Sequence, residues 1–417
     1  MVSADFREHL LPDDDPRLTD LRGLDVRGYA EYAKTDPFAG PMIAGWAELY
    51  PQPFVGITSD GTVRPDLFRM DDVRPGEEAP TQEMVIAAEK LLGTLDAAAR
   101  ERIRYPVDAH EWRSWANPEF LQHDTGIRLD EVCEATRDAA LALVAATLSP
   151  AGERLFRTAM KINGYLGDVV GLPRLMNEFS YNVAVFGDPS PTDPWGWQLF
   201  GHHLAVNVLV IGPRMVVSPV FFGAEPNSLD GGDPAGPFGR RIQLARAAMG
   251  ALSDDLRGRA TTYAELRDPA MPAGRLHPGD ERTLAGCFQD NRVIPLEGIR
   301  VSEMPHRAVD LVWAVVRDAL SYLPSGPLGR RLREITEHAD ETWFSWIGGW
   351  QDSEPFYFRI QSPVLLTELD HHCGVFLANT EPAVFHIHTI VRTPNAGDYG
   401  RALLAQLPGH PPGGTQS

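Results

Sequence analysis

Cysteine and lysine are both scarce in this chain of 417 residues, which contains three of each. The cysteines, Cys133, Cys287 and Cys373, are too few and too far apart for a disulfide framework or for the CxxC pairs of a structural zinc site. Lysine is outnumbered by arginine, which limits any chemistry based on a lysine amine. The sparse, widely spaced cysteines lead us to expect a protein of a reducing compartment, with a cytoplasmic location.

The short motifs of several large enzyme classes are absent. No two glycines are separated by a single residue, which excludes a GxGxxG loop, and no lysine follows a glycine, which excludes a P-loop. The patterns HExxH, GxSxG and SxxK do not occur either. Any enzymatic chemistry must therefore depend on other groups.

Long apolar runs and an excess of positive charge are also lacking. The stretch 139–148 is far shorter than the roughly 20 residues of a membrane-spanning helix, and residues 1–11 do not form a secretion signal. The net charge of −19 argues against nucleic acids and anionic membranes, which need a basic face. We expect a small-molecule partner, with no nucleic acid and no membrane, and the oligomeric state stays open.

Apolar residues make up 43% of the chain, and their spacing predicts both helices and strands. Helices are expected over 84–95, 132–143, from 150 onward, and over 240–256, 309–320 and 329–338. Strands are expected over 54–57, 181–186, 197–211, 214–222, 356–360, 364–369, 375–377 and 385–391. Because two strand groups flank helical stretches, we predict an α+β fold: a mixed, largely antiparallel sheet with helices packed on it, in a single large domain.

Composition divides the chain into three parts. Residues 1–50 begin with a polar stretch rich in proline and aspartate, and we expect an irregular N-terminal arm. Residues 51–405 carry the expected α+β domain. Residues 406–417 are rich in proline and glycine, and we expect a disordered tail.

Histidine is the residue whose placement stands out. Six of the 13 histidines occur in three tight pairs, His202-His203, His371-His372 and His386/His388. Alternate residues of a strand project from one face, about 6–7 Å apart, so an HxH pair can converge on one metal ion. Adjacent histidines at strand ends are also often structural, hydrogen-bonded groups, so each pair alone leaves both interpretations open.

The strand pattern selects among these histidines. In a continuous strand over 197–211, His203 shares a face with small and polar residues, whereas His202 lies on the apolar face. We predict one mononuclear metal site drawn from His203, His371, His386 and His388, with His202 in reserve. An all-imidazole set suits copper, iron or zinc far better than magnesium or calcium, and we predict copper or iron, with zinc as the alternative.

Two arginines are candidates for binding a substrate. Arg392 lies four residues after His388, on the same strand face, and Arg113 lies between Trp112 and Trp115. A guanidinium group beside a metal can bind a carboxylate through two parallel hydrogen bonds. We predict a substrate with a carboxylate group on this basis; the alternative for Arg392 is a surface salt bridge, and for Arg113 a stacked structural arginine.

Several phrases of the sequence resemble the DUF3500 family of bacteria and fungi, for which no function is assigned. The phrases are EWRSWAN at 111–117, PWGWQLFGHHL at 194–204, FGAEP at 222–226, HIHTIVRTPN at 386–395 and TPNAGDYG at 393–400. The resemblance extends from about residue 53 to 404. It implies one shared domain in which the GHH phrase, His371 and the HxH phrase are family features, and it implies no reaction.

With the other motifs absent, the predicted metal would supply the reactivity. Copper or iron held by three or four histidines would activate dioxygen, whereas zinc would activate water. The tryptophans around 195–197 and 343–350 suit an oxidative pocket slightly better than a hydrolytic one; the alternative for them is an ordinary hydrophobic core. We predict a metal-dependent oxidoreductase, an oxidase or oxygenase acting on a small molecule; a zinc-dependent metallohydrolase and a non-catalytic metal- or ligand-binding protein are the alternatives.

Overall fold

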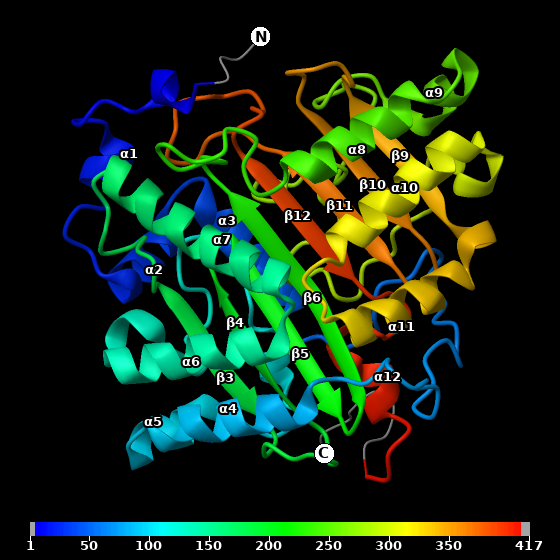
Figure 1. Cartoon of the computed structure of the whole chain (residues 1–417). Helices are drawn as coiled ribbons and strands as arrows, with labels where there is room; N and C mark the ends of the chain where they lie inside the picture. The colour runs from blue at the N-terminus through cyan, green and yellow to red at the C-terminus, as the bar shows by residue number, and fades with distance from the viewer. Residues whose placement is uncertain (1–4, 410–417) are drawn as a thin grey trace.

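The computed structural model describes residues 5–409 and is organised around one 12-stranded sheet (Figure 1). The strands are β1 (Arg104–Tyr105), β2 (Ile127–Arg128), β3 (Tyr181–Phe186), β4 (Trp195–Gly201), β5 (Leu204–Ile211), β6 (Arg214–Ala224), β7 (Thr261–Tyr263), β8 (Ile299–Arg300), β9 (Trp343–Gly348), β10 (Phe356–Gln361), β11 (Leu366–His371) and β12 (Ile387–Arg392). Their order is β1-β3-β4-β5-β6-β12-β11-β10-β9-β7, with β2 beside β3 and β8 beside β9. Only β1 with β3 and β7 with β9 pair in parallel. The α+β prediction with a mixed, largely antiparallel sheet is confirmed.

Helices pack around this sheet. The α-helices of the described chain are α1 (Pro16–Thr19), α2 (Val26–Thr35), α3 (Ala39–Leu49), α4 (Thr81–Gly93), α5 (Ala97–Ile103), α6 (Glu134–Thr147), α7 (Pro150–Val169), α8 (Gly239–Gly250), α9 (Asp254–Ala260), α10 (His306–Ala319), α11 (Ser325–Thr336) and α12 (Arg401–Leu404). Figure 1 shows α6 and α7 in front of β3–β5, and α8 and α10 in front of β9–β11. None of these helices combines the length and the apolar character needed to cross a membrane.

The local sequence explains where several helices begin. Ser149 caps α7 by accepting a hydrogen bond from the Gly152 backbone N–H, and Pro150 occupies the first turn, where no backbone donor is needed. Asp130, in contrast, does not cap α6. That helix begins at Glu134, and the Asp130 carboxylate instead accepts two hydrogen bonds from Arg128.

The N-terminal part of the chain is more ordered than the sequence predicted. Residues 1–50 were expected to be irregular, but 26–35 and 39–49 form helices α2 and α3. The reason is that Tyr29, Ala33, Met42 and Trp46 are all buried against the rest of the molecule, which stabilises the helical conformation. Of the predicted tail, residues 410–417 lie outside the described part of the chain.

The strand predictions differ from the structure at several places. The segments 54–57 and 375–377 do not form strands, and β9 forms where only an aromatic cluster was noted. The predicted strand 197–211 is divided into β4 and β5, with His202 and His203 in the turn between them. Whether a short segment forms a strand depends on the neighbouring strand with which it pairs, and the sequence of the segment does not reveal that partner.

The register of the central strands separates two faces of the sheet. Tyr357 of β10, Asp370 of β11 and His388 of β12 are direct cross-strand neighbours, so their side chains project from one face, here called the polar face. His371 pairs with Ile387 and therefore projects from the opposite face. Helix α8 covers that opposite face, with Arg246 lying over the ring of Phe356.

The polar face is covered by an irregular segment, residues 264–298, here called the covering loop. Its backbone is held on the sheet by side chains of the strands. The Leu284 and Ala285 N–H groups both donate to the Glu368 carboxylate, at 2.9 Å each. Further along, Gln361 donates to the Ile294 carbonyl at 2.8 Å. The covering loop and the polar face therefore enclose a polar interior layer.

Candidate metal centre

Three of the predicted histidines meet in the interior of the protein. The Nε2 atoms of His386 and His388 lie 3.1 Å apart, and the His203 Nε2 atom lies 3.3 Å from the first and 3.1 Å from the second. Each of the three residues is 4% exposed or less. Within residues 5–409, no other histidine, cysteine, aspartate or glutamate joins this group, in which all ligand atoms lie within 4.8 Å of one another.

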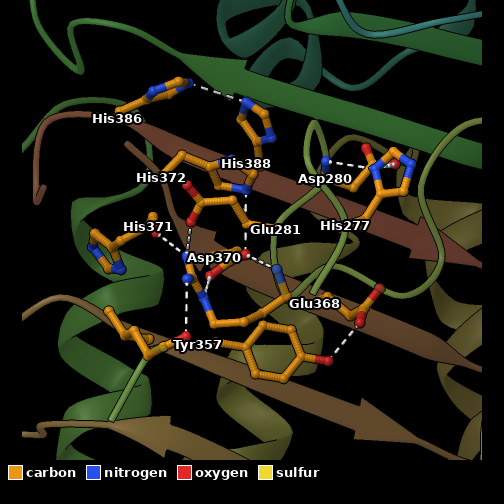
Figure 2. A network of polar contacts seen from close by, with 12 residues as sticks. His277, Asp280, Glu281, Tyr357, Glu368, Asp370, His371, His372, His386 and His388 are labelled. Carbon is orange, nitrogen blue, oxygen red and sulfur yellow. Dashed lines mark hydrogen bonds and ion pairs between the residues drawn. The ribbon is translucent and has the colours of Figure 1, made fainter. Parts of the chain in front are cut away.

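The two strand histidines are placed by the alternation that the sequence predicted. His386 comes immediately before β12 and His388 is its second residue, so both rings project from the polar face. Figure 2 shows the two rings directed toward each other. The HxH spacing thus brings two ligands together without any contribution from the rest of the fold.

His203 reaches the group by a different route from the one predicted. It lies in the two-residue turn between β4 and β5, with a left-handed backbone angle φ of 59°, rather than inside a strand. Its carbonyl accepts a hydrogen bond of 2.7 Å from the N–H of Gly223, which is the cross-strand neighbour of His388. The face argument that selected His203 was therefore wrong, although the residue itself belongs to the group.

Gly223 is a site residue that the sequence reasoning missed. A Cβ atom at this position would lie 2.9 Å from His203 Cδ2, closer than carbon atoms approach without a shift. The absence of a side chain on Gly223 therefore lets the His203 ring pass across β6 to β12. The FGAEP phrase contains this glycine, but only the pairing of β6 with β12 shows why it matters.

The geometry of the three nitrogens fits one transition-metal ion. Three imidazole nitrogens held this close together are a donor set that would suit copper, iron or zinc. No fourth histidine, cysteine or carboxylate of the described residues belongs to the group. Three protein ligands with an open position are typical of catalytic metal sites, whereas structural sites are fully coordinated.

The imidazoles are prepared for metal binding by burial. Burial lowers the pKa of His203, His386 and His388 well below the usual value, because the charged form would lose its hydration. For His386 the tautomer is also fixed, since its Nδ1 atom donates to the Cys373 carbonyl at 2.6 Å. The lone pair of His386 is therefore on Nε2, the atom directed at the other two rings.

His202, the reserve ligand, supports the group without belonging to it. Its Nδ1 atom lies 2.8 Å from Asn163 Oδ1, and its ring stacks on His203 with the ring centres 3.9 Å apart. Burial lowers the pKa of His202 to about 3, so the ring is neutral. His202, held by Asn163, therefore packs against the His203 ring and helps to fix its position.

His371, the fourth predicted ligand, is not brought to the group. Its ring contacts Phe356 on the opposite face, and its Nδ1 atom lies 2.8 Å from the Phe356 carbonyl oxygen. The next residue, His372, projects to the polar face instead and packs on His388, with the ring centres 3.7 Å apart. The register of β11 against β12 thus decides which of these adjacent histidines faces the metal centre.

A network of ionic contacts supports His372 from below (Figure 2). The His372 Nε2 atom lies 3.2 Å from Asp370, which accepts hydrogen bonds of 2.7 Å from Arg282 Nε and 3.0 Å from the Arg282 backbone N–H. Arg282 also donates to Glu281. Although burial opposes it, the neighbouring His372 and Arg282 lower the pKa of Glu281 to about 2. The network therefore anchors the covering loop beside the metal centre.

Glu225 is a second residue that the sequence reasoning missed. This buried side chain follows β6, and its Oε1 atom lies 3.5 Å from His386 Nδ1 and accepts from the Val375 N–H at 3.3 Å. Its Oε2 atom has no hydrogen-bond partner in the described chain. Burial raises the pKa of Glu225 to about 8. Like Gly223, Glu225 belongs to the FGAEP phrase of the sequence.

The two predicted substrate-binding arginines are engaged with the protein itself. Arg392 donates to Asp290 at 2.8 Å, to Asp398 at 3.3 Å, and to the backbone carbonyls of the covering loop. Arg113 donates to the other oxygen of Asp290 at 2.8 Å. Burial opposes it, but the charges of Arg392 and Arg113 lower the pKa of Asp290. Both guanidinium groups thus stabilise the fold around Asp290.

Comparison with known proteins identifies a family and nothing more specific. The family described as "Protein of unknown function (DUF3500)" matches residues 77–401 of the chain. Neither a curated protein nor a solved structure matches it. Since the match covers most of the chain and includes all three histidines of the candidate metal centre, the chain belongs to the DUF3500 family.

Proposed function

We propose that His203, His386 and His388 bind one transition-metal ion and that the protein is a metal-dependent enzyme acting on a small molecule. The observation that carries this proposal is the convergence of three buried Nε2 atoms within 3.1–3.3 Å of one another. No protein acceptor other than these rings contacts those three atoms in residues 5–409. Three buried imidazole nitrogens that contact only one another form an arrangement that a bound metal ion would satisfy.

We further propose copper or iron as the metal, and therefore an oxidoreductase, an oxidase or oxygenase. Neutral imidazoles suit copper, iron and zinc, and the first two supply redox and dioxygen chemistry when bound. The protein contributes the ligands and an apolar wall: the ring of Phe221 meets His388 edge to face, with the centres 5.1 Å apart.

A zinc-dependent metallohydrolase is the second candidate. Three histidines with no fourth protein ligand in the described chain would leave a zinc ion an open position, and zinc bound in this way would activate water. The absence of a fourth protein ligand in the described chain argues against a non-catalytic structural site. The three cysteines are free, which fits the expected cytoplasmic location.

Metal analysis of the purified protein tests the proposal. We expect about one equivalent of copper or iron per chain, and loss of that metal in the variant His386→Ala/His388→Ala. His306→Ala, a change at an exposed histidine, is the matched control and should retain the metal. Metal that survives the double substitution would overturn the assignment.

The reaction class is decided by a second measurement on the metal-loaded protein. Oxygen consumption together with an electron paramagnetic resonance signal supports an oxidoreductase. Zinc as the bound metal, with hydrolysis of model esters that His386→Ala/His388→Ala abolishes, supports the hydrolase instead.

A further inference from the structure

A small cavity lies on the face of the sheet opposite the metal centre. It has a volume of about 40 Å³ and is lined by residues of β6, β12, α11 and α12, together with Phe68. Val391 of β12 belongs to this wall and, by the alternation of the strand, projects away from the side that carries His386 and His388. Figure 1 shows α11 and α12 at the same end of the sheet. The sheet therefore separates the cavity from the two strand histidines.

The cavity has room for a ligand of a few atoms. One water molecule needs about 10–15 Å³ of such a space, so the cavity corresponds to about three water molecules. This size matches an anion of about three or four non-hydrogen atoms, such as formate or acetate. Much of the wall is apolar and buried: Phe68, Val217, Leu323, Val391 and Leu403.

Three arginines of the cavity wall share one carboxylate. Glu334 accepts hydrogen bonds from Arg330 Nε at 3.0 Å and from Arg331 Nη1 at 3.4 Å. The Arg214 Nη2 atom lies 3.7 Å from the same carboxylate. Glu334 is the only acidic residue of the lining, and within residues 5–409 the three arginines form no other ion pair. The wall thus carries three positive charges and one negative charge.

Other carboxylates of this region are bound elsewhere. Asp72 and Glu77 accept hydrogen bonds from Arg333 at 2.7 and 2.8 Å, so their charge acts on Arg330 only from a distance. Asp398, which accepts a hydrogen bond from the Thr393 N–H, pairs with Arg392. None of these three acids belongs to the lining of the cavity. They offset the positive charge of the wall in part and without contact.

Two of the arginines also have donors that the protein does not use. Arg214 Nε and Arg330 Nη1 are buried and have no hydrogen-bond partner in the described part of the chain. Both side chains are otherwise fixed, because each donates to the Arg69 carbonyl. A buried donor without an acceptor is unfavourable. An anion in the cavity would supply acceptors to guanidinium groups that are already held in place.

We propose that this cavity binds a small carboxylate, of the size of formate or acetate. The guanidinium groups of Arg214, Arg330 and Arg331 provide the charge and the planar donors that suit a carboxylate, and the apolar wall receives the alkyl part. The net charge of −19 repels anions at long range, so such a ligand needs a local group of cations. The proposal does not depend on the metal centre.

Acetate and its neutral analogue acetamide test the site. At constant ionic strength, we expect acetate to raise the melting temperature of the wild-type protein and acetamide to leave it unchanged, because only a bound ligand shifts the unfolding equilibrium. Saturation-transfer NMR of the acetate methyl group measures binding directly. Arg330→Gln should weaken binding about tenfold or more, since a charged hydrogen-bond donor is lost. Arg307→Gln, a change at an exposed arginine, should behave as wild type.

A second variant fills the cavity and leaves every guanidinium group in place. Ala402 of α12 lines the cavity, and Ala402→Leu should abolish acetate binding by occupying the space. Hexanoate should bind more weakly than acetate, because the cavity has room for only a few atoms. Acetate could also bind a metal ion, so the response is compared in His386→Ala/His388→Ala. That variant should retain acetate binding, and the two proposals therefore fail independently.

Three outcomes would overturn the inference. One is the absence of acetate binding to the wild type, and another is equal binding to the wild type and Ala402→Leu. The third is tighter binding of chloride or phosphate than of acetate, since neither ion has an alkyl part for the apolar wall. If Arg330→Gln fails to fold, Ala402→Leu decides alone.

Discussion

Histidines on the two faces of β11 and β12 have different surroundings. On the face covered by helix α8, His371 lies against Phe356 and within 2.8 Å of a backbone carbonyl. On the polar face, His386 and His388 direct their Nε2 atoms at each other and at His203. His371 and His372 are adjacent in sequence and still belong to different faces. The face of the sheet on which a histidine lies therefore decides whether it can belong to the metal centre.

The strongest test of this comparison removes one histidine from each face. His388→Ala should weaken metal binding more than about 100-fold, because removing a ligand costs more than disturbing a neighbour of one. His371→Ala should leave the metal content unchanged and lower only the stability. Metal titrations followed by mass spectrometry measure both effects. Equal loss of metal in the two variants would show that the faces do not differ in function.

The next test concerns the ion pairs that Arg392 forms with Asp290 and Asp398. Arg392→Ala leaves Asp398 without its buried cation and Asp290 with Arg113 alone, and we expect the free energy of unfolding to fall by about 3–5 kcal/mol. Urea denaturation measures this loss. A variant that keeps its stability but loses affinity for an organic acid would instead restore Arg392 as a substrate-binding residue.

A smaller effect is expected at the crossing of His203 over β6. Gly223→Ala places a Cβ atom against the His203 ring, and we expect metal affinity to fall about 10- to 100-fold while the fold is retained. Gly258→Ala, in a helix where an added Cβ meets no atom within 4 Å, is the matched control. Isothermal titration with zinc or copper compares the two. An unchanged affinity in Gly223→Ala would mean that His203 can reach the group by another path.

The smallest effect is a change in the pH dependence of stability from the opposite face. Burial lowers the pKa of His371 to about 4, whereas the unfolded chain takes up this proton near 6.5. The unfolded state therefore binds more protons between these values, and stability is lost as the pH falls below about 6.5. His371→Phe should remove about 1.4 kcal/mol per pH unit from that slope. Thermal unfolding between pH 4 and 7 measures it, and identical slopes in both proteins would contradict the prediction.

Much of the fold could be predicted from local patterns. The apolar stripe that includes Met84, Ala88 and Leu91 forms α4, and the Ser149-Pro150 pair begins α7, because both signals act within one turn of helix. Strand β3 has the predicted bounds. The helices of residues 26–49 were missed because their stability comes from burial of residues such as Trp46 against distant segments, not from strong local signals.

The sequence by itself determined that His386 and His388 share a face, because the alternation of a β-strand is a local property. It also determined the family, through phrases long enough to be specific. Only the tertiary structure decided that His203 completes the group and that His371 does not. Both outcomes depend on contacts between segments far apart in the chain. Strand β11 pairs with β12, and the His203 ring, carried by the turn between β4 and β5, crosses β6 at Gly223 to reach β12. The same reason explains the two predicted arginines, since the acceptors of Arg392 and Arg113 depend on where the covering loop lies.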